Sequence, residues 1–136
     1  MKKVILLSSI LLVSPKIFAA DINIDISNIK SNTGNLIIGL FNSKDRFLTD
    51  KYKALKIKAQ VGSINGKFEN IPNGTYAIAL YHDENMNNKL DKNLFHIPKE
   101  GYGFSNNAKP FFGPPKFNKA QFKLDGNYHA QINMKY

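Results

Sequence analysis

Apolar residues recur at every second position through most of this chain, a period typical of half-buried β-strands. The alternating runs are 22–27, 36–41, 55–61, 68–71, 75–82, 120–124 and 128–136. Turn-forming clusters such as Pro72-Asn73-Gly74 separate them. We therefore predict an all-β fold, a single immunoglobulin-like or transthyretin-like β-sandwich of about seven strands with one long ordered loop. We expect the first two runs to pair as a hairpin, and only residues 47–55 could hold a short helix.

The first twenty residues have the order of a secretory signal peptide. A basic start at residues 1–3 precedes an apolar run at 4–13, and Ala19-Ala20 offers small residues for cleavage. The apolar run is about half the roughly 20 residues that a membrane-spanning helix needs. We predict that residues 1–20 are a cleaved signal peptide and that 21–136 form the β-sandwich domain. The mature chain would then have no transmembrane segment, and the protein would be periplasmic or secreted.

The charge of the chain excludes one class of partner. There are 19 Lys plus Arg against 10 Asp plus Glu, the lysines are spread along the chain, and Arg46 is the one arginine. A nucleic-acid surface needs clustered arginine with interleaved aromatic residues, so we predict no nucleic-acid partner. The chain contains no cysteine, which excludes disulfides, a thiol nucleophile and zinc–thiolate sites.

The connection over residues 83–117 is much longer than the turns between the other predicted strands. Connections above roughly 12–15 residues without secondary structure are usually functional or disordered. This one is rich in aromatic, glycine and proline residues, so we predict an ordered loop over one end or face of the sandwich. We expect Phe104 and Phe117 to join the core. The candidates for an aromatic surface that binds a protein, peptide or glycan are Tyr102, Phe111 and Phe112.

Three irregular segments carry a family resemblance. They are YAIALYHDENMNNKLD at 76–91, IPKEGYGFSNN at 97–107 and FGPPKF at 112–117. With the rest of the mature chain, they resemble the domain of unknown function 2141 family. Asn88 stands where such loops often carry glycine, and asparagine tolerates the same left-handed conformation. The resemblance implies an exported bacterial β-sandwich and supplies no reaction.

Oxygen-bearing side chains stand at alternate positions at the start of the long loop. The first, third, fifth and ninth positions match the opening of an EF-hand-like calcium loop, and a backbone carbonyl could add another ligand. The candidate ligands for Ca²⁺ are Asp83, Asn85, Asn87, the Lys89 carbonyl and Asp91. The twelfth position is Leu94, where an EF-hand has a bidentate glutamate. A weak site for calcium or another hard cation and a metal-free turn held by Asp and Asn side chains both stay open.

A hydrolase-like enzyme is the alternative function. Its candidate groups are Asp83, Glu84, His96 and Glu100, which would have to converge to hydrogen-bonding distance. The chain has no His-Glu-x-x-His, no Gly-x-Ser-x-Gly and no phosphate-binding glycine loop. Its three histidines are expected at strand ends on the surface. We therefore favour a non-enzymatic binding or structural module whose functional surface is the long loop, and leave open whether it is an enzyme.

Overall fold

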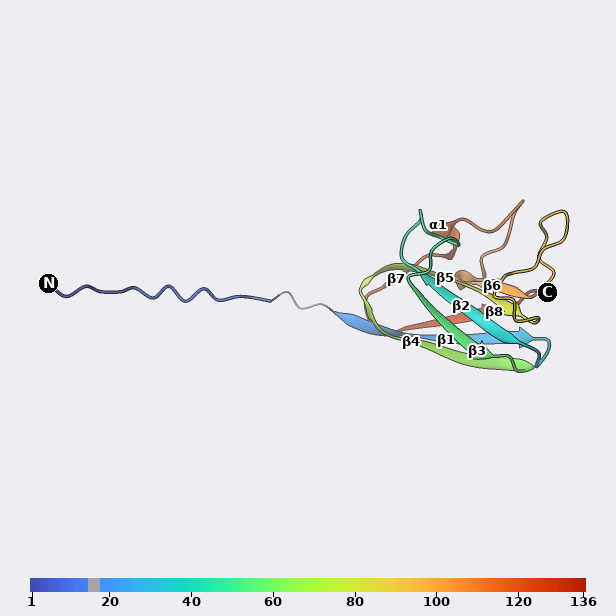
Figure 1. Ribbon diagram of the computed structural model, residues 1–136, viewed down its shortest axis with the longest axis horizontal. Helices are drawn as coiled ribbons and strands as arrows, with labels where there is room; N and C mark the ends of the chain where they lie inside the picture. The colour runs from blue at the N-terminus through green and yellow to red at the C-terminus, as the bar shows by residue number, and fades with distance from the viewer. Residues whose placement is uncertain (15–17) are drawn as a thin grey trace.

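The computed structural model describes residues 1–14 and 18–136, so residues 15–17 of the predicted signal peptide lie outside the described residues. Residues 1–14 have no regular secondary structure and extend away from the folded domain (Figure 1). In the described part of the chain, no helix is long and apolar enough to cross a membrane. The elements are β1 (Ala19–Ile29), β2 (Asn35–Phe41), β3 (Lys53–Lys58), β4 (Gly62–Pro72), β5 (Gly74–Asp83), β6 (Tyr102–Phe104), η1 (Ser105–Asn107), α1 (Phe117–Ala120), β7 (Phe122–Leu124) and β8 (Tyr128–Asn133).

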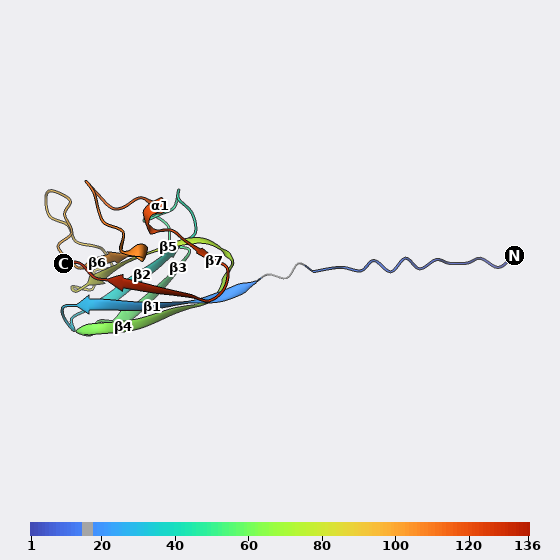
Figure 2. The same cartoon turned by 180° about the vertical axis from the view of Figure 1, so that it is seen from behind.

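Two β-sheets pack face to face, which confirms the predicted all-β sandwich (Figures 1 and 2). The smaller sheet has the strand order β4-β1-β8, and the larger has the order β3-β2-β5-β6 with β7 paired to β5. Strand β1 is antiparallel to β4 and parallel to β8. The described residues form eight strands, against about seven predicted, because β6 forms a short additional strand inside the long loop.

Two details of the prediction are wrong. β1 and β2 do not form a hairpin, since they belong to different sheets and the turn between them crosses from one sheet to the other. A turn signal marks a reversal of the chain but does not specify which strand the next segment joins. The expected helix at 47–55 is also absent: the backbone makes turns there until the Tyr52 N–H donates to the Leu40 carbonyl, and β3 begins at Lys53.

The main core lies between the sheets and follows from the alternation. Ile22, Ile24 and Ile26 of β1 are fully buried, and they pack in one cluster with the alternating apolar residues of the other strands. Strand β5 is apolar on both faces because its outer face is covered as well. A second buried cluster on that face contains Phe41, Ala77, Phe104, Phe117 and Ala120. The predicted burial of Phe104 and Phe117 is confirmed.

The long loop is anchored through the middle of its length. β6 pairs with β5, and the buried Ser105 hydroxyl accepts a hydrogen bond from the Ile78 N–H at 2.9 Å and donates one to the Ala120 carbonyl at 2.5 Å. The segments on either side of this anchor project from the domain (Figure 1). We call residues 89–99 the first arm and residues 108–116 the second arm.

Candidate functional site

The loop leaves the sandwich at Asp83, the last residue of β5. Its side chain is buried, and its two carboxylate oxygens accept the backbone N–H groups of Asn87 at 3.2 Å and Asn88 at 2.8 Å. The chain therefore wraps around this carboxylate. Asn88 has φ 60°, the left-handed conformation that asparagine tolerates better than most residues.

Asparagine side chains tie the far end of this turn to Asp91. The Asn85 and Asn87 amide nitrogens donate to the two Asp91 carboxylate oxygens at 2.6 and 2.9 Å. These hydrogen bonds lower the pKa of Asp91, with the Asn87 bond as the larger cause. The amide oxygens of the same asparagines accept backbone N–H groups two residues ahead, those of Asn87 and Lys89. Every predicted cation ligand therefore lies in one compact turn.

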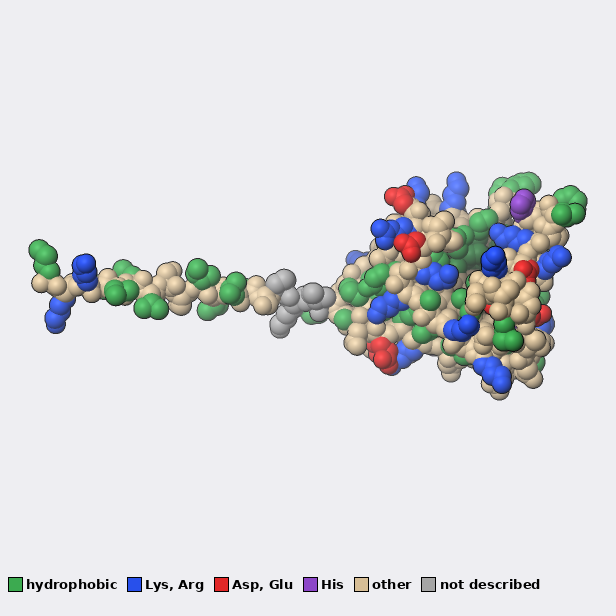
Figure 3. Space-filling view, viewed as in Figure 1, with side chains coloured by type: hydrophobic (Ala, Val, Ile, Leu, Met, Phe, Trp, Pro, Cys, Tyr) green, Lys and Arg blue, Asp and Glu red, His purple; other side chains and the backbone are tan. Residues whose placement is uncertain are grey.

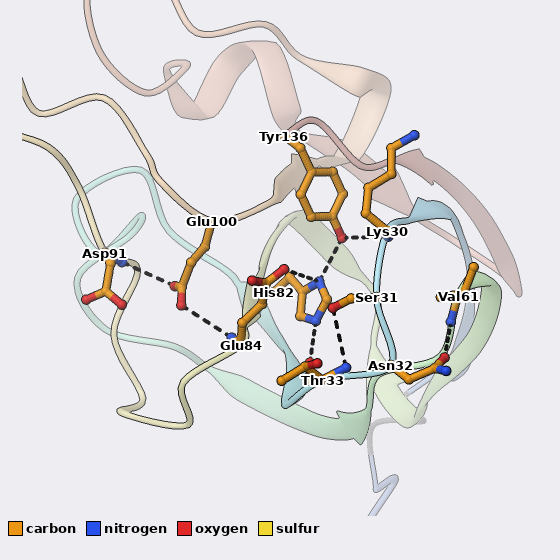
Figure 4. Close-up of polar contacts among 10 residues, drawn as sticks. All are labelled: Lys30, Ser31, Asn32, Thr33, Val61, His82, Glu84, Asp91, Glu100 and Tyr136. Atoms are coloured by element: carbon orange, nitrogen blue, oxygen red, sulfur yellow. Dashed lines mark hydrogen bonds and ion pairs between the residues drawn. The ribbon is translucent and has the colours of Figure 1, made fainter.

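Glu100 closes the turn from the other end of the first arm (Figure 4). Its carboxylate accepts the backbone N–H groups of Glu84 and Asp91, both at 3.3 Å, and the residue is buried. Burial raises the pKa of Glu100, and the negative charges of Asp91 and Asp83 raise it further, while the two N–H donors act in the opposite direction. Burial and then the charges of Asp83 and Glu100 also raise the pKa of the neighbouring Tyr81 phenol.

A second set of polar groups lies beside the turn, around His82 (Figure 4). Its Nε2 lies 2.6 Å from the Thr33 carbonyl oxygen, and its Nδ1 lies 2.7 Å from the Tyr136 hydroxyl. Because a carbonyl can only accept, Nε2 donates to the Thr33 carbonyl, while Nδ1 shares a hydrogen bond with the Tyr136 hydroxyl and lies 3.7 Å from a Glu84 carboxylate oxygen. The same hydroxyl accepts the Lys30 N–H at 3.2 Å. The expected surface position of the histidines is therefore wrong for His82, which is fully buried and ties β5 to the last residue of the chain.

Two glycines at the base of the loop, Gly34 and Gly101, are needed for close packing. Gly34 has φ +71°, and a Cβ there would overlap the Asp83 carbonyl oxygen. A Cβ on Gly101 would lie 2.5 Å from the Tyr136 ring. The base of the loop is thus packed without room for an added methyl group.

The first arm is held by one side chain that the sequence reasoning missed. The Asn93 carboxamide oxygen accepts the N–H groups of Phe95 at 2.9 Å and Ile97 at 3.0 Å, while the Asn93 N–H donates to the Ile97 carbonyl. Asparagine side chains commonly accept backbone N–H groups a few residues ahead and so form turns. The asparagine at position 93 is therefore the sequence signal that could have predicted this turn.

The two arms enclose an apolar pocket of about 580 Å³ above β6. Of the predicted binding residues, Tyr102 and Phe112 line it and Phe111 does not. Tyr102 is half-buried, whereas both phenylalanines are exposed and stack edge to face with ring centroids 4.8 Å apart. The full lining is Leu90, Lys92, Phe95, His96, Ile97, Pro98, Tyr102, Phe104, Pro110, Phe112, Gly113 and Pro114.

The candidate catalytic groups are distributed over different parts of the loop. His96 lies on the first arm beside the pocket, while Asp83 and Glu100 are buried at the base. Within the described residues, His96 makes no side-chain hydrogen bond or ion pair with Asp83, Glu84 or Glu100. The same part of the chain brings no three histidine or acidic side chains together as metal ligands. A cation at this turn would therefore need amide and carbonyl oxygens in addition to the carboxylates of Asp83 and Asp91.

The comparisons with known proteins agree with the resemblance seen in the loop segments. Comparison with curated proteins and with solved structures finds no match. Residues 24–132 match the model of DUF2141, described as an uncharacterized protein conserved in bacteria. The matched range includes β2 to β7 entire, the Asp83–Asp91 turn and both arms. The chain therefore belongs to the DUF2141 family.

Proposed function

We propose that this protein is a non-enzymatic binding module whose ligand site is the apolar pocket between the two arms. The observation that carries the proposal is the pocket itself, because a concave space of several hundred Å³ with mostly apolar walls is the usual form of a small-ligand site. Its walls come from both arms and its lower part from Tyr102 and Phe104 of β6. The ligand would present an apolar group such as a peptide side chain or the apolar face of a sugar.

The hydrogen bonds at the base of the loop support this proposal because they fix where the loop leaves the sandwich. The carboxylates of Asp83 and Glu100 accept backbone N–H groups at the two ends of the first arm. The position of this arm relative to the sandwich is therefore fixed. A binding site held in place before the ligand arrives avoids the cost of ordering it on binding. The hydrolase alternative has less support. The carboxylates of Asp83 and Glu100 already accept backbone N–H groups, and among the described residues His96 forms no hydrogen bond or ion pair with either of them.

We also propose that the Asp83–Asp91 turn binds calcium weakly. The two carboxylates, the two amide oxygens and the Lys89 carbonyl are the hard oxygen ligands that calcium takes. Calcium would have to replace the hydrogen bonds from Asn85 and Asn87 to Asp91 with oxygen contacts. That exchange, together with only two charged ligands, leads us to expect a Kd on the order of 10⁻⁴–10⁻³ M.

The pocket can be tested with an anionic apolar dye, 1-anilinonaphthalene-8-sulfonate. We expect saturable binding to the native protein and a loss of about tenfold in affinity on Ile97→Asp, since a charge would then line the pocket. Val61→Asp is the matched control, because Ile97 and Val61 are 57% and 55% exposed but Val61 lies away from the pocket. Equal affinity of both variants, or no saturable binding by the native protein, would contradict the pocket proposal.

The calcium site is tested by thermal unfolding in calcium and in magnesium at equal ionic strength. Calcium at ten times its Kd should stabilise the native protein by about 1.4 kcal/mol, and Asp91→Asn should reduce that gain. No difference between the two cations up to about 10 mM would remove the calcium proposal.

We further propose that the protein is exported after cleavage of the N-terminal signal peptide. Cleavage after Ala19 would leave the buried Ala20 paired with Ile71, whereas cleavage after Ala20 would remove that contact. The predicted removal of residues 1–20 starts the mature chain at Asp21, and cleavage after Ala19 is the alternative. The intact mass of the protein recovered from the periplasm and the culture medium tests both the cleavage and its position.

A further inference from the structure

The outer tips of the two arms carry apolar side chains that the pocket does not use. Leu94 on the first arm is 96% exposed and Phe111 on the second is 83% exposed, and neither lines the pocket between the arms. Phe95 and Phe112 beside them are also exposed. Figure 3 shows hydrophobic side chains projecting at this corner of the molecule, with lysine or arginine side chains below them. Exposed apolar clusters of this kind mark interaction surfaces on proteins or membranes.

The charge around these tips has one sign. Between Asp91 and Glu100 the chain has no acidic residue, and from Gly101 to Leu124 it has none either. The exposed lysines of the arms are Lys92, Lys99, Lys109 and Lys116. Among the residues that the structure describes, none of these four lysines forms an ion pair. The acidic groups at the ends of the first arm, Asp91 and Glu100, are occupied at the base. The tips are therefore apolar with a positively charged surround.

We propose that the two arms dock on a lipid bilayer that contains anionic phospholipids. Leu94 and Phe111 would enter the boundary between headgroups and acyl chains, where aromatic rings are favoured. The lysines would extend their ammonium groups toward the lipid phosphates, as long basic side chains do at membrane interfaces. Anionic lipid is favoured over a protein partner because single protruding side chains on two separate loops suit a deformable surface with uniform negative charge. This inference shares the arms with the proposed function but does not use the pocket.

The first arm is already held in the docking arrangement, and Ser105 anchors the chain just before the second arm. Asn93 fixes the turn of the first arm, and Asp83 and Glu100 fix its base. Docking would then cost little ordering of the backbone.

The experiment uses tryptophan as a local reporter, since the chain has none. The full-length variants Leu94→Trp and Phe111→Trp report on the two arms, and Val61→Trp, at a position 55% exposed between β3 and β4, is the control. Each is titrated with vesicles of phosphatidylcholine alone and of phosphatidylcholine with phosphatidylglycerol. We expect the emission of both arm variants to move to shorter wavelength only with phosphatidylglycerol, and to return at high salt. The N-terminal segment is common to all three variants, so it cannot produce a difference between them.

A charge test accompanies the reporter. In the Phe111→Trp background, Lys109→Gln with Lys116→Gln should weaken vesicle binding about 25-fold, since each lysine near an anionic surface is worth about fivefold. The matched control is Lys53→Gln with Lys56→Gln in β3, which removes the same charge from an exposed strand away from the arms. A similar loss in both pairs would indicate an effect of net charge alone and would overturn the arm-specific docking.

Three further results would overturn the inference. They are unchanged emission of both arm variants with anionic vesicles, an equal shift with neutral vesicles, and a shift that depends on protein concentration without lipid. The last would mean that the tips cover a second copy of the chain. Dye binding without a vesicle response would leave the pocket proposal standing and remove this one, and a vesicle response without dye binding would do the reverse.

Discussion

The base of the long loop and its two arms differ in which side chains they bury and which they expose. At the base, Asp83, His82 and Glu100 are charged or polar and buried. On the arms, Leu94 and Phe112 are apolar and almost entirely exposed. Both arrangements reverse the common preference of globular proteins, in which apolar residues are buried and charged ones are exposed.

The polar side chains at the base can be buried without a large free-energy cost because their hydrogen bonds are all formed. In the described part of the chain, no buried side-chain nitrogen or oxygen lacks a hydrogen-bond partner. An unpaired buried polar group costs about 1–3 kcal/mol, so such a cluster is stable only when its partners are all in place. The arms make few contacts with the core clusters, so their side chains are available for binding without loss of the fold.

Among substitutions at the base of the loop, Asp83→Ala should have the largest effect on stability. It removes the acceptor of two backbone N–H groups, so the Asn88 N–H loses its partner and the Asn87 N–H keeps only its longer bond to the Asn85 amide oxygen. We expect a loss of about 3 kcal/mol in the free energy of unfolding, measured by urea denaturation. Asp125→Ala, at an exposed aspartate in the turn before β8, is the control and should change stability by less than about 0.5 kcal/mol. Similar values for the two would mean that the turn is not held by Asp83.

Gly101→Ala should follow, with a loss of about 2 kcal/mol from overpacking. The added methyl group would lie against the Tyr136 ring. In a Tyr136→Ala background the same substitution should cost at least about 1 kcal/mol less, because the ring is gone. Additive losses in this double-mutant cycle would show that some contact other than the ring excludes the methyl group.

Glu100 should give a smaller, pH-dependent effect. Because the folded state raises its pKa above the ordinary 4.5, folding favours the protonated form. Its contribution to stability is therefore fully present below pH 4.5 and is lost as the pH rises through the folded-state pKa. Subtracting the stability curve of Glu100→Gln from that of the native protein should isolate this decline. A difference curve that rises with pH would contradict the raised pKa, which a carbon-13 titration of the carboxyl group measures directly.

Phe112→Ala should have the smallest effect on the fold. The ring is exposed, so we expect a change within about 0.5 kcal/mol. Phe104→Ala is the matched control in the buried cluster, where loss of the ring should cost about 3–5 kcal/mol. A large loss for Phe112→Ala in thermal or urea unfolding would mean that the second arm belongs to the core and is not a binding surface.

Local patterns predicted the parts of the fold that depend on neighbours in sequence. Alternation identified the strands because burial of one sheet face leaves a period of two, as in Ile22, Ile24 and Ile26. The spacing from Asp83 to Asp91 correctly placed a compact turn, because its hydrogen bonds join residues two to six positions apart. The metal content of that turn stays a prediction.

Contacts between distant residues could not be predicted in the same way. The Glu84 N–H reaches Glu100 across 16 residues, and His82 reaches Tyr136 across 54. The sheet that β2 joins, the burial of His82 and the pocket between the arms all depend on such contacts. Each contact has many possible partners that are chemically equivalent, and only the three-dimensional packing selects among them.

The amino-acid sequence by itself determined an all-β chain with a basic and apolar N-terminal segment, an Asp- and Asn-rich turn and a long aromatic loop. Only the tertiary structure decided that His82 is buried against Tyr136 while His96 and His129 are exposed, although all three are the same residue type. The physical reason is that burial depends on what the other sheet and the returning chain bring to a position. The chemistry of a side chain specifies only how much free energy it gains or loses when it is buried.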